Sequence, residues 1–286
     1  MTLDDIGFLI IGATKSATTW LQRALQRDPA VSMPDPELHY FSRFHERGHD
    51  WYLAQFHKGL ETRLLGEKSN SYLESADAAR RIARALPNVR LIAQLRNPVD
   101  RAYSDYCMMY RRGEVGRNIG AYLDPRNPQD TRLLRAGYYF EQLKAFYDHF
   151  PADRIHVTFY ETVASDPAGH LAAVRRFLSL NEEVSLGGVD AKVKDKTAPM
   201  LAPALRRWLA PVKPVVAPMR QTALFRGVHR VLASEIRYSP LSDSLRRRLE
   251  EHYAADVERL GRLVGRDLSQ WLNSAKGSRS GGQAFP

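Results

Sequence analysis

Residues 8–20, FLIIGATKSATTW, constrain the fold of this chain more than any other stretch. A short apolar run ends at Gly12, and a lysine and small hydroxyl residues then lead into a sequence typical of a helix. This order predicts a buried strand, a tight turn and a helix whose free N–H groups point into the loop. Lys15 adds a positive charge to that loop. We interpret the loop as an anion cradle for a phosphate or a sulfate ester. The alternative is an ordinary strand-to-helix turn capped by a Ser or Thr.

The cradle differs from the Walker A loop that binds ATP. The Walker A motif reads G-x-x-x-x-G-K-[ST], whereas only Ala13 and Thr14 separate Gly12 from Lys15 here. The sequence therefore disfavours an enzyme that uses Mg-ATP.

The charge of the chain restricts its partners. The 286 residues include 42 Lys and Arg against 32 Asp and Glu, a formal net charge of +10. Such a charge attracts polyanions, including nucleic acid, nucleotides, sulfated or phosphorylated glycans and anionic lipid. The alternative is a solvated basic surface of dispersed arginines. We find no RNP-like motif or zinc-ligand spacing, so we expect no nucleic-acid partner.

The sequence also bears on location. It has no apolar run of ~18 residues that would predict a membrane span. Its first residues, MTLDDIGF, lack the basic start of a secretory signal. The single cysteine, Cys107, rules out an intrachain disulfide and suits a reducing compartment. We expect a cytoplasmic protein, and we leave its oligomeric state open.

Strand and helix signals alternate through the first half of the chain. The expected strands are 8–11, 64–65, 90–95 and 155–159, and the expected helices are 18–26, 75–85, 98–111, 140–150 and one capped at 165–167 that reaches 178. This alternation predicts an α/β protein with a P-loop-like three-layer fold: a mostly parallel central sheet with helices on both faces. Ligands of such sheets bind at the carboxyl ends of the strands, where the cradle and Arg96 both lie.

The later part of the chain lacks the regular alternation of strand and helix signals. We expect one domain over residues 1–272, with a polar loop or lid at 111–135. Residues 184–240 are rich in proline and are predicted to be irregular, shaping a lid or an acceptor cleft. A long amphipathic helix is predicted at 241–263, and residues 273–286 are predicted to be a disordered tail.

A second anion-binding group lies in LRNPVDRAYSDY, residues 95–106. Arg96 comes just after the strand at 90–95, and Ser104 comes eight residues later within the next helix. Both side chains can reach one phosphate, for which arginine offers a planar fork of donors. The alternative is that Arg96 pairs with an acid such as Asp100.

The two groups together, KSATTWL and LRNPVDRAYSDY, resemble the nucleotide-binding signature of the sulfotransferases that use 3'-phosphoadenosine-5'-phosphosulfate (PAPS). Further segments resemble the heparan-sulfate-type (N-/3-O-sulfotransferase-like) branch of that family, in order and spacing. They are PELHYFSRF (36–44), GHDWYLAQF (48–56), GEKSNSYLES (66–75), FYETVASDPAGHLAAVRRFLSL (159–180) and HYAADVERLGRLVGRDLSQW (252–271). The resemblance covers about residues 7–183 and 245–271. Because the sequence shows no secretory signal or membrane anchor, we expect a bacterial-type member.

The resemblance implies how the nucleotide would be held. Lys15 would contact the bridging oxygen and stabilise charge on the leaving phosphate. Arg96 and Ser104 would bind the 3'-phosphate. The remaining nucleotide-binding positions lie in the loop and the start of the helix; Ser16, Ala17, Thr18 and Thr19 would wrap the 5'-phosphate, and Trp20 belongs to the same motif.

The resemblance also implies a reacting face. Glu37 matches the glutamate that serves as catalytic base, His39 matches a position near the reacting centre, and Lys68 matches a second active-site lysine. His39 is the alternative base. Without the resemblance, Glu37 could be a solvent-exposed loop residue and His39 a core histidine. Lys68 would be expected on the surface. Glu67 is expected to be structural.

These residue types suit sulfuryl transfer. Like phosphoryl transfer, that reaction needs positioning and charge stabilisation more than covalent catalysis. The acceptor must lose a proton to a base, and lysines can stabilise the charge that develops on the leaving phosphate. The resemblance implies PAPS as co-substrate, and because lysines can supply the positive charge we expect no metal.

One region departs from the family pattern. Animal heparan-type enzymes carry a disulfide loop and a Lys-Gly-Arg clamp before the final helix, and this chain has neither. VKDKTAPM (193–200) occupies that region, where Lys194 or Lys196 are candidate replacements. The expected acceptor is a hydroxyl or amine of a small molecule, lipid or glycan. A P-loop-like nucleotide kinase and a non-catalytic polyanion-binding protein remain the alternative functions.

Overall fold

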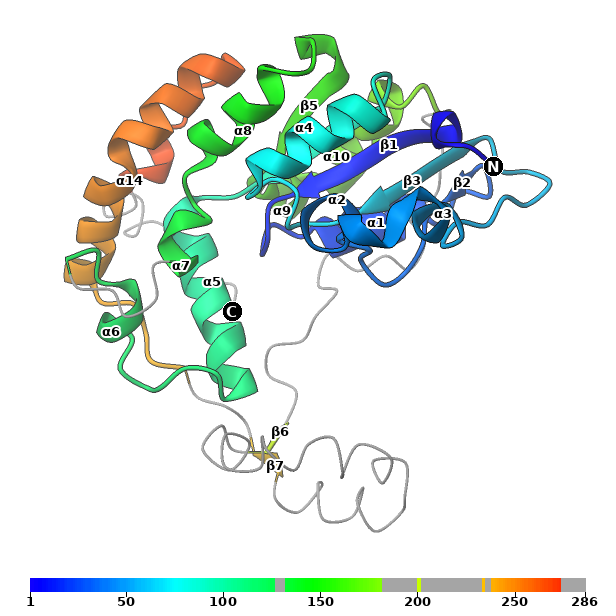
Figure 1. Cartoon of the computed structure of the whole chain (residues 1–286). Coiled ribbons are helices and arrows are strands. Elements are labelled where there is room, and N and C mark those ends of the chain that lie inside the picture. Colours follow the sequence, from blue (N-terminus) through cyan, green and yellow to red (C-terminus); the bar gives the residue numbers. More distant parts are fainter. Residues whose placement is uncertain (127–131, 182–199, 202–232, 235–237, 274–286) are drawn as a thin grey trace.

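The computed structural model describes residues 1–126, 132–181, 200–201, 233–234 and 238–273. A five-stranded parallel sheet with the order β2-β3-β1-β4-β5 lies at its centre (Figure 1). The strands are β1 (Ile6–Gly12), β2 (Val31–Ser32), β3 (Leu64–Lys68), β4 (Arg90–Leu95) and β5 (Ile155–Phe159). A separate antiparallel pair consists of β6 (Met200–Leu201) and β7 (Ala233–Ser234). The predicted parallel α/β architecture is confirmed.

Helices connect the strands and surround the sheet. They are α1 (Thr18–Leu25), α2 (Tyr40–Arg43), α3 (Gly48–Leu53), α4 (Ala76–Ala85), α5 (Pro98–Arg112), α6 (Gly120–Leu123), α7 (Arg132–Arg135), α8 (Tyr139–Tyr147), α9 (Tyr160–Ser165), α10 (Pro167–Phe177) and α14 (Asp243–Val264). Short 3-10 helices occur at Leu3–Asp5, His45–Arg47, Ala152–Arg154 and Ser269–Trp271. Over the described ranges, no helix has both the length and the apolar character needed to cross a membrane.

The sheet separates two hydrophobic cores. Successive residues of a strand face opposite sides. Phe8 and Ile10 of β1 accordingly pack with α1 and α10, whereas Leu9 and Ile11 pack with α4, α5, α8 and α14. Figure 1 shows α4, α8 and α14 gathered on one side of the sheet. Because helices cover both faces, the strands read as continuous apolar runs in the sequence.

Side-chain caps set the starts of α4, α5 and α10. Ser75 Oγ accepts from the backbone of the first turn of α4, and Asp166 does the same for α10. Asn97 accepts from two backbone N–H groups of α5, where Pro98 occupies the first turn. These interactions satisfy donors that a helix start leaves unpaired. They place Arg96, just before the Asn97 cap, at the carboxyl end of β4.

The structure changes the bounds of some predicted elements and adds others. β3 continues from the predicted 64–65 through Lys68, and α8 ends at Tyr147, short of the predicted 150. The helices α2, α3 and α9 were not predicted. The predicted loop at 111–135 contains the single turns α6 and α7.

Several predictions fall outside the described residues. Lys194 and Lys196 lie there, as do most of the predicted irregular region at 184–240 and the tail from residue 274 onward. The long helix predicted at 241–263 is confirmed as α14.

Candidate active site

The anion cradle is the loop between β1 and α1. Lys15 and Ala17 both adopt left-handed backbone conformations, with φ of 68° and 62°. Such turns can direct successive N–H groups into an anion-binding concavity. Gly12 has φ of 154°, and a Cβ there would lie 2.8 Å from the Cβ of Leu73, so the loop leaves β1 through a position that suits glycine. The N-cap of α1 is Ala17, which excludes the capping Ser or Thr of the alternative interpretation.

Two buried polar atoms at the cradle fit an anionic ligand. Ser16 is fully buried, and its Oγ has no hydrogen-bond partner among the described residues. The Nε of Arg96 is likewise buried without a partner in the described part of the chain. Leaving such atoms unpaired is costly, and a ligand with anionic groups at both positions would satisfy them. The cradle and the end of β4 therefore fit a phosphate-bearing ligand.

A buried network supports the cradle from within the sheet. The side-chain amide of Gln94, on β4, donates to the backbone carbonyl of Ser16. His170 Nε2 lies 2.9 Å from Gln94 Oε1, and His170 Nδ1 lies 3.1 Å from Thr158 Oγ1. Burial lowers the pKa of His170 to about 4, so the ring is neutral at pH 7. Sequence reasoning missed this role; the signal was a glutamine inside the apolar run RLIAQL.

Arg96 links the end of β4 to the cradle. It donates from its guanidinium to the backbone carbonyl of Lys15 at 3.3 Å. The same guanidinium lies over the ring of Tyr160, 4.3 Å from its centroid. Asp100 instead pairs with Arg246 at 2.7 Å. The alternative pairing of Arg96 with Asp100 is therefore not what the structure shows.

Lys15 extends toward α5. Its Nζ lies 3.5 Å from Met108 Sδ. Met108 follows Ser104 by four residues, so the two share one face of the helix. Ser104 is itself buried, with 5% of its surface exposed. The joint binding of one phosphate by Arg96 and Ser104 stays a prediction.

Trp20 lies in the core between the sheet and α10. It is 1% exposed, and its ring makes an edge contact with His170 at 5.9 Å between centroids. Thr18, at the first position of α1, is also buried. A nucleotide contact for either residue stays a prediction.

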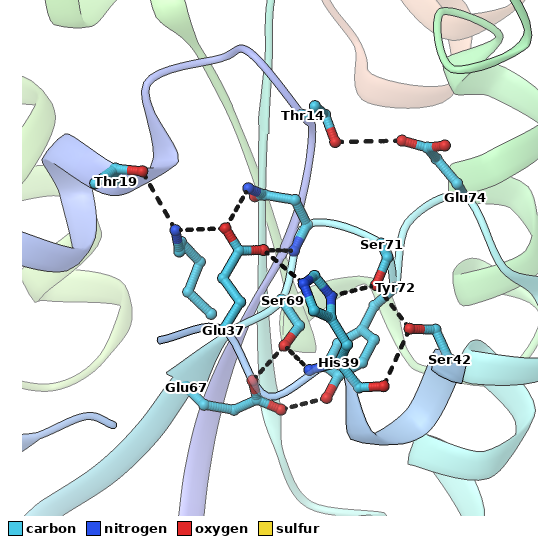
Figure 2. Close-up of polar contacts among 12 residues, drawn as sticks. Thr14, Thr19, Glu37, His39, Ser42, Glu67, Ser69, Ser71, Tyr72 and Glu74 are labelled. Atoms are coloured by element: carbon cyan, nitrogen blue, oxygen red, sulfur yellow. Dashed lines mark hydrogen bonds and ion pairs between the residues drawn. The ribbon is translucent and has the colours of Figure 1, made fainter. Parts of the chain in front are cut away.

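Lys68 joins the cradle to the predicted reacting face. Its Nζ donates to Glu37 Oε1 at 2.8 Å and to Thr19 Oγ1 at 3.3 Å (Figure 2). Lys68 is the last residue of β3 and is only 4% exposed, although a lysine taken alone was expected on the surface. One buried ammonium group thus connects the start of α1 with Glu37.

Glu37 is held by several donors. Its Oε2 accepts from the backbone N–H of Asn70 at 2.9 Å, and its Oε1 accepts from the side chain of Asn70 at 3.1 Å. The same Oε2 lies 3.7 Å from Nε2 of His39. Figure 2 shows the carboxylate and the imidazole facing each other. Glu37 is therefore an organised part of the site, in contrast to a loop residue that only meets solvent.

His39 is partly buried and contacts polar groups on both sides of its ring. Its Nδ1 lies 2.7 Å from Ser71 Oγ, which in turn lies 2.6 Å from Ser42 Oγ. Burial lowers the pKa of His39 below its usual 6.5, although the Glu37 carboxylate acts in the opposite direction. The ring is therefore neutral at pH 7 and able to accept a proton.

Glu67 lies fully buried behind this face. It accepts hydrogen bonds from Tyr72 at 2.5 Å, Ser69 at 2.7 Å and Tyr52 at 3.3 Å. Ser69 Oγ also accepts from the backbone N–H of His39 at 2.8 Å. Burial raises the pKa of Glu67 to about 7. Glu67 thus anchors the hydroxyl that fixes the backbone of His39.

Known proteins match this chain in sequence. Residues 50–183 match the model of the sulfotransferase family. Human heparan sulfate glucosamine 3-O-sulfotransferase 6 is 34% identical over 181 residues, covering 62% of this chain and 53% of the relative. Human bifunctional heparan sulfate N-deacetylase/N-sulfotransferase 2 is 32% identical over 193 residues, covering 60% and 22%. The chain thus spans about half or less of the length of these curated relatives.

A solved structure matches the fold. A sulfotransferase from Alicyclobacillus acidocaldarius aligns with a TM-score of 0.69 over 93% of this chain and 98% of that chain, at 24% identity. The family match includes Lys68, Arg96 and Ser104, whereas Lys15 and Glu37 precede it. The resemblance inferred from the motifs is confirmed over the matched segments: residues 50–183 match the sulfotransferase family, and the relatives that match in sequence are heparan sulfate sulfotransferases.

Proposed function

We propose that the protein transfers a sulfuryl group from PAPS to a hydroxyl or amine acceptor. The contact pattern of Lys68 carries this proposal. Its Nζ reaches both Thr19 Oγ1, at the start of α1, and Glu37 Oε1. An anion site and a proton-accepting site thus meet at one buried cation, an arrangement that suits in-line group transfer.

The residues around the cradle support a nucleotide with phosphates at two positions. Lys15 and the N–H groups at the start of α1 suit the 5'-phosphate. Arg96 and Ser104 suit a separate 3'-phosphate, because the unpaired Nε of Arg96 leaves a buried donor for it. When bound, PAPS supplies an activated sulfuryl group whose leaving group is a phosphate.

The side chains divide the chemical work between charge and proton. Lys15 and Lys68 stabilise negative charge that grows on the leaving phosphate, and they favour the transition state over the ground state. Glu37, with His39 behind it, takes the proton that the acceptor must lose. Lys68 and Asn70 hold the Glu37 carboxylate in place for that step.

The acceptor is proposed only as a class. The relatives are named for sulfation at an oxygen and at a nitrogen of heparan sulfate, so both a hydroxyl and an amine remain within the proposal. We propose a small-molecule, lipid or glycan acceptor.

A transfer assay tests the proposal. The protein is incubated with labelled PAPS and pools of candidate acceptors, and products are read by mass. We expect transfer that survives EDTA and is lost in Glu37→Ala, while nucleotide binding is largely kept. EDTA-sensitive transfer from ATP would instead support the kinase alternative. Salt-dependent polyanion binding that ignores the 3'-phosphate would support the non-catalytic alternative.

A further inference from the structure

Two serines form a chain of hydrogen bonds on the side of His39 that faces away from Glu37. His39 Nδ1 lies 2.7 Å from Ser71 Oγ, and Ser71 Oγ lies 2.6 Å from Ser42 Oγ. Ser42 Oγ donates back to the backbone carbonyl of His39 at 3.3 Å. Figure 2 shows the ring between this chain and Glu37.

The protons of this chain can be counted. Each hydroxyl carries one proton, and a carbonyl oxygen only accepts. The proton of Ser42 therefore goes to the His39 carbonyl, and the proton of Ser71 goes to Ser42. The contact between Ser71 and the ring must then be donated by Nδ1–H. On the other side, the Glu37 carboxylate at 3.7 Å favours a proton on Nε2.

All of these contacts are satisfied together only when both ring nitrogens carry a proton. With the proton on Nδ1 alone, the lone pair of Nε2 faces the Glu37 carboxylate. With the proton on Nε2 alone, the hydroxyl chain must reverse, and Ser42 no longer donates to the carbonyl. The arrangement is therefore complementary to the imidazolium form of His39.

Burial of the ring and two nearby cations disfavour the imidazolium form of His39. Burial, Arg43 and Lys68 all lower the pKa of His39, and Glu37 raises it. The backbone of His39 is also fixed, because its N–H donates to Ser69 Oγ and its φ is 50°. The resting ring is thus neutral and fixed in position, and the serine chain is ready to stabilise it once it is protonated.

We propose that Ser71, supported by Ser42, is a positioning residue that holds the His39 ring against Glu37 and stabilises its doubly protonated form. For the reaction itself, this inference rests on the proposed sulfuryl transfer. The acceptor O–H or N–H bond breaks as Glu37 takes the proton, and Glu37 passes that proton to Nε2 of His39. The electron pair stays on the acceptor atom, which bonds to sulfur, while the S–O bond to the 5'-phosphate breaks and its electron pair goes to that phosphate.

An NMR titration of histidine-labelled protein tests the inference without PAPS or an acceptor. The His39 signal is assigned by its loss in His39→Gln. In Ser71→Ala we expect the pKa of His39 to fall by about 0.5 to 1, because the imidazolium loses the acceptor of its Nδ1–H. Ser71→Thr keeps a hydroxyl and should keep the pKa near that of the wild type. Ser165→Ala, which removes an exposed hydroxyl bonded to the Glu161 carbonyl, is the matched control and should change nothing.

Steady-state kinetics test whether the contact between Ser71 and His39 affects turnover. In Ser71→Ala we expect kcat to fall about 3- to 10-fold, with KM for PAPS unchanged and the acid limb of the pH profile moved to lower pH. An unmoved His39 pKa in a folded Ser71→Ala variant overturns the inference, even if sulfuryl transfer is found. The expected pKa change without any transfer supports the positioning role and instead counts against the proposed function.

Discussion

Gln94 donates from its side-chain amide to the backbone carbonyl of Ser16, which attaches the anion cradle to the centre of the sheet. The orientation of that amide is set by His170, whose Nε2 lies 2.9 Å from Gln94 Oε1. Because the low pKa of His170 keeps its ring neutral, one ring nitrogen donates to Gln94 and the other accepts from Thr158. The shape of the cradle therefore depends on residues that no anion would touch.

Replacing Gln94 with glutamate should disturb the cradle. Gln94→Glu places an acceptor against the Ser16 carbonyl in a fully buried site, and we expect a loss of about 1–3 kcal/mol in unfolding free energy. Affinity for 3'-phosphoadenosine-5'-phosphate (PAP) should fall about tenfold or more by calorimetry. Gln22→Glu is the matched control. Gln22 lies on α1, is also buried, and donates from its side-chain amide to the backbone carbonyl of Pro34 at 3.0 Å. Equal PAP affinity in both variants would refute a role for Gln94 in the cradle.

Lys68 should matter more for turnover than for nucleotide binding. Lys68→Met removes the cation between Thr19 and Glu37, and we expect kcat to fall about 100-fold or more while the Kd for PAP changes only a few-fold. Lys68→Arg keeps the charge but not the compact geometry, and should recover only part of the rate. Steady-state rates and PAP titrations on the same preparations provide the comparison. A Lys68→Met enzyme with near-normal kcat would show that this lysine is only structural.

The buried Glu67 should make stability depend on pH. Its pKa is raised in the fold to about 7 from the usual 4.5, so the stabilisation from its neutral form is complete below pH 4.5 and is lost as pH rises through about 7. Gln cannot ionise, so the stability of Glu67→Gln relative to wild type should rise across this window by roughly 1 kcal/mol per pH unit and then level off. Urea unfolding at a series of pH values measures the difference. A Glu67→Gln curve that ran parallel to wild type across this window would contradict the assignment.

The central strands and the helix after β4 were predictable because local signals agree there. The run at 90–95 is mostly apolar and is followed by Arg96, Asn97 and Pro98, so neighbouring residues indicate both the end of the strand and the start of the helix. β3 was predicted too short because Gly66, Glu67 and Lys68 do not look like a buried strand. The partners that allow burial of the two charges, Tyr52 and Glu37 among them, lie 15 to 31 residues away in the chain, beyond the reach of periodicity.

In the candidate site, too, some residues were predictable from the local sequence and others depend on contacts with distant residues. The cradle was predictable from its glycine, lysine and hydroxyl residues, whereas Glu37, His39 and Lys68 came only from the family resemblance. Gln94, Ser71 and Ser42 were missed because their roles depend on contacts across loops and strands. A signal was present in the small polar residues 69–71, which follow the carboxyl end of a parallel strand.

Calorimetric titration with PAP and with 5'-AMP tests the central claim most directly, namely that this fold holds a sulfuryl-donor nucleotide through both of its phosphates. We predict that wild type binds PAP at least about tenfold more tightly than 5'-AMP, because a charge-assisted contact to the 3'-phosphate contributes about 1.5 kcal/mol or more. Arg96→Ala should lose most of that difference. Equal affinity of the wild type for PAP and 5'-AMP would contradict the claim.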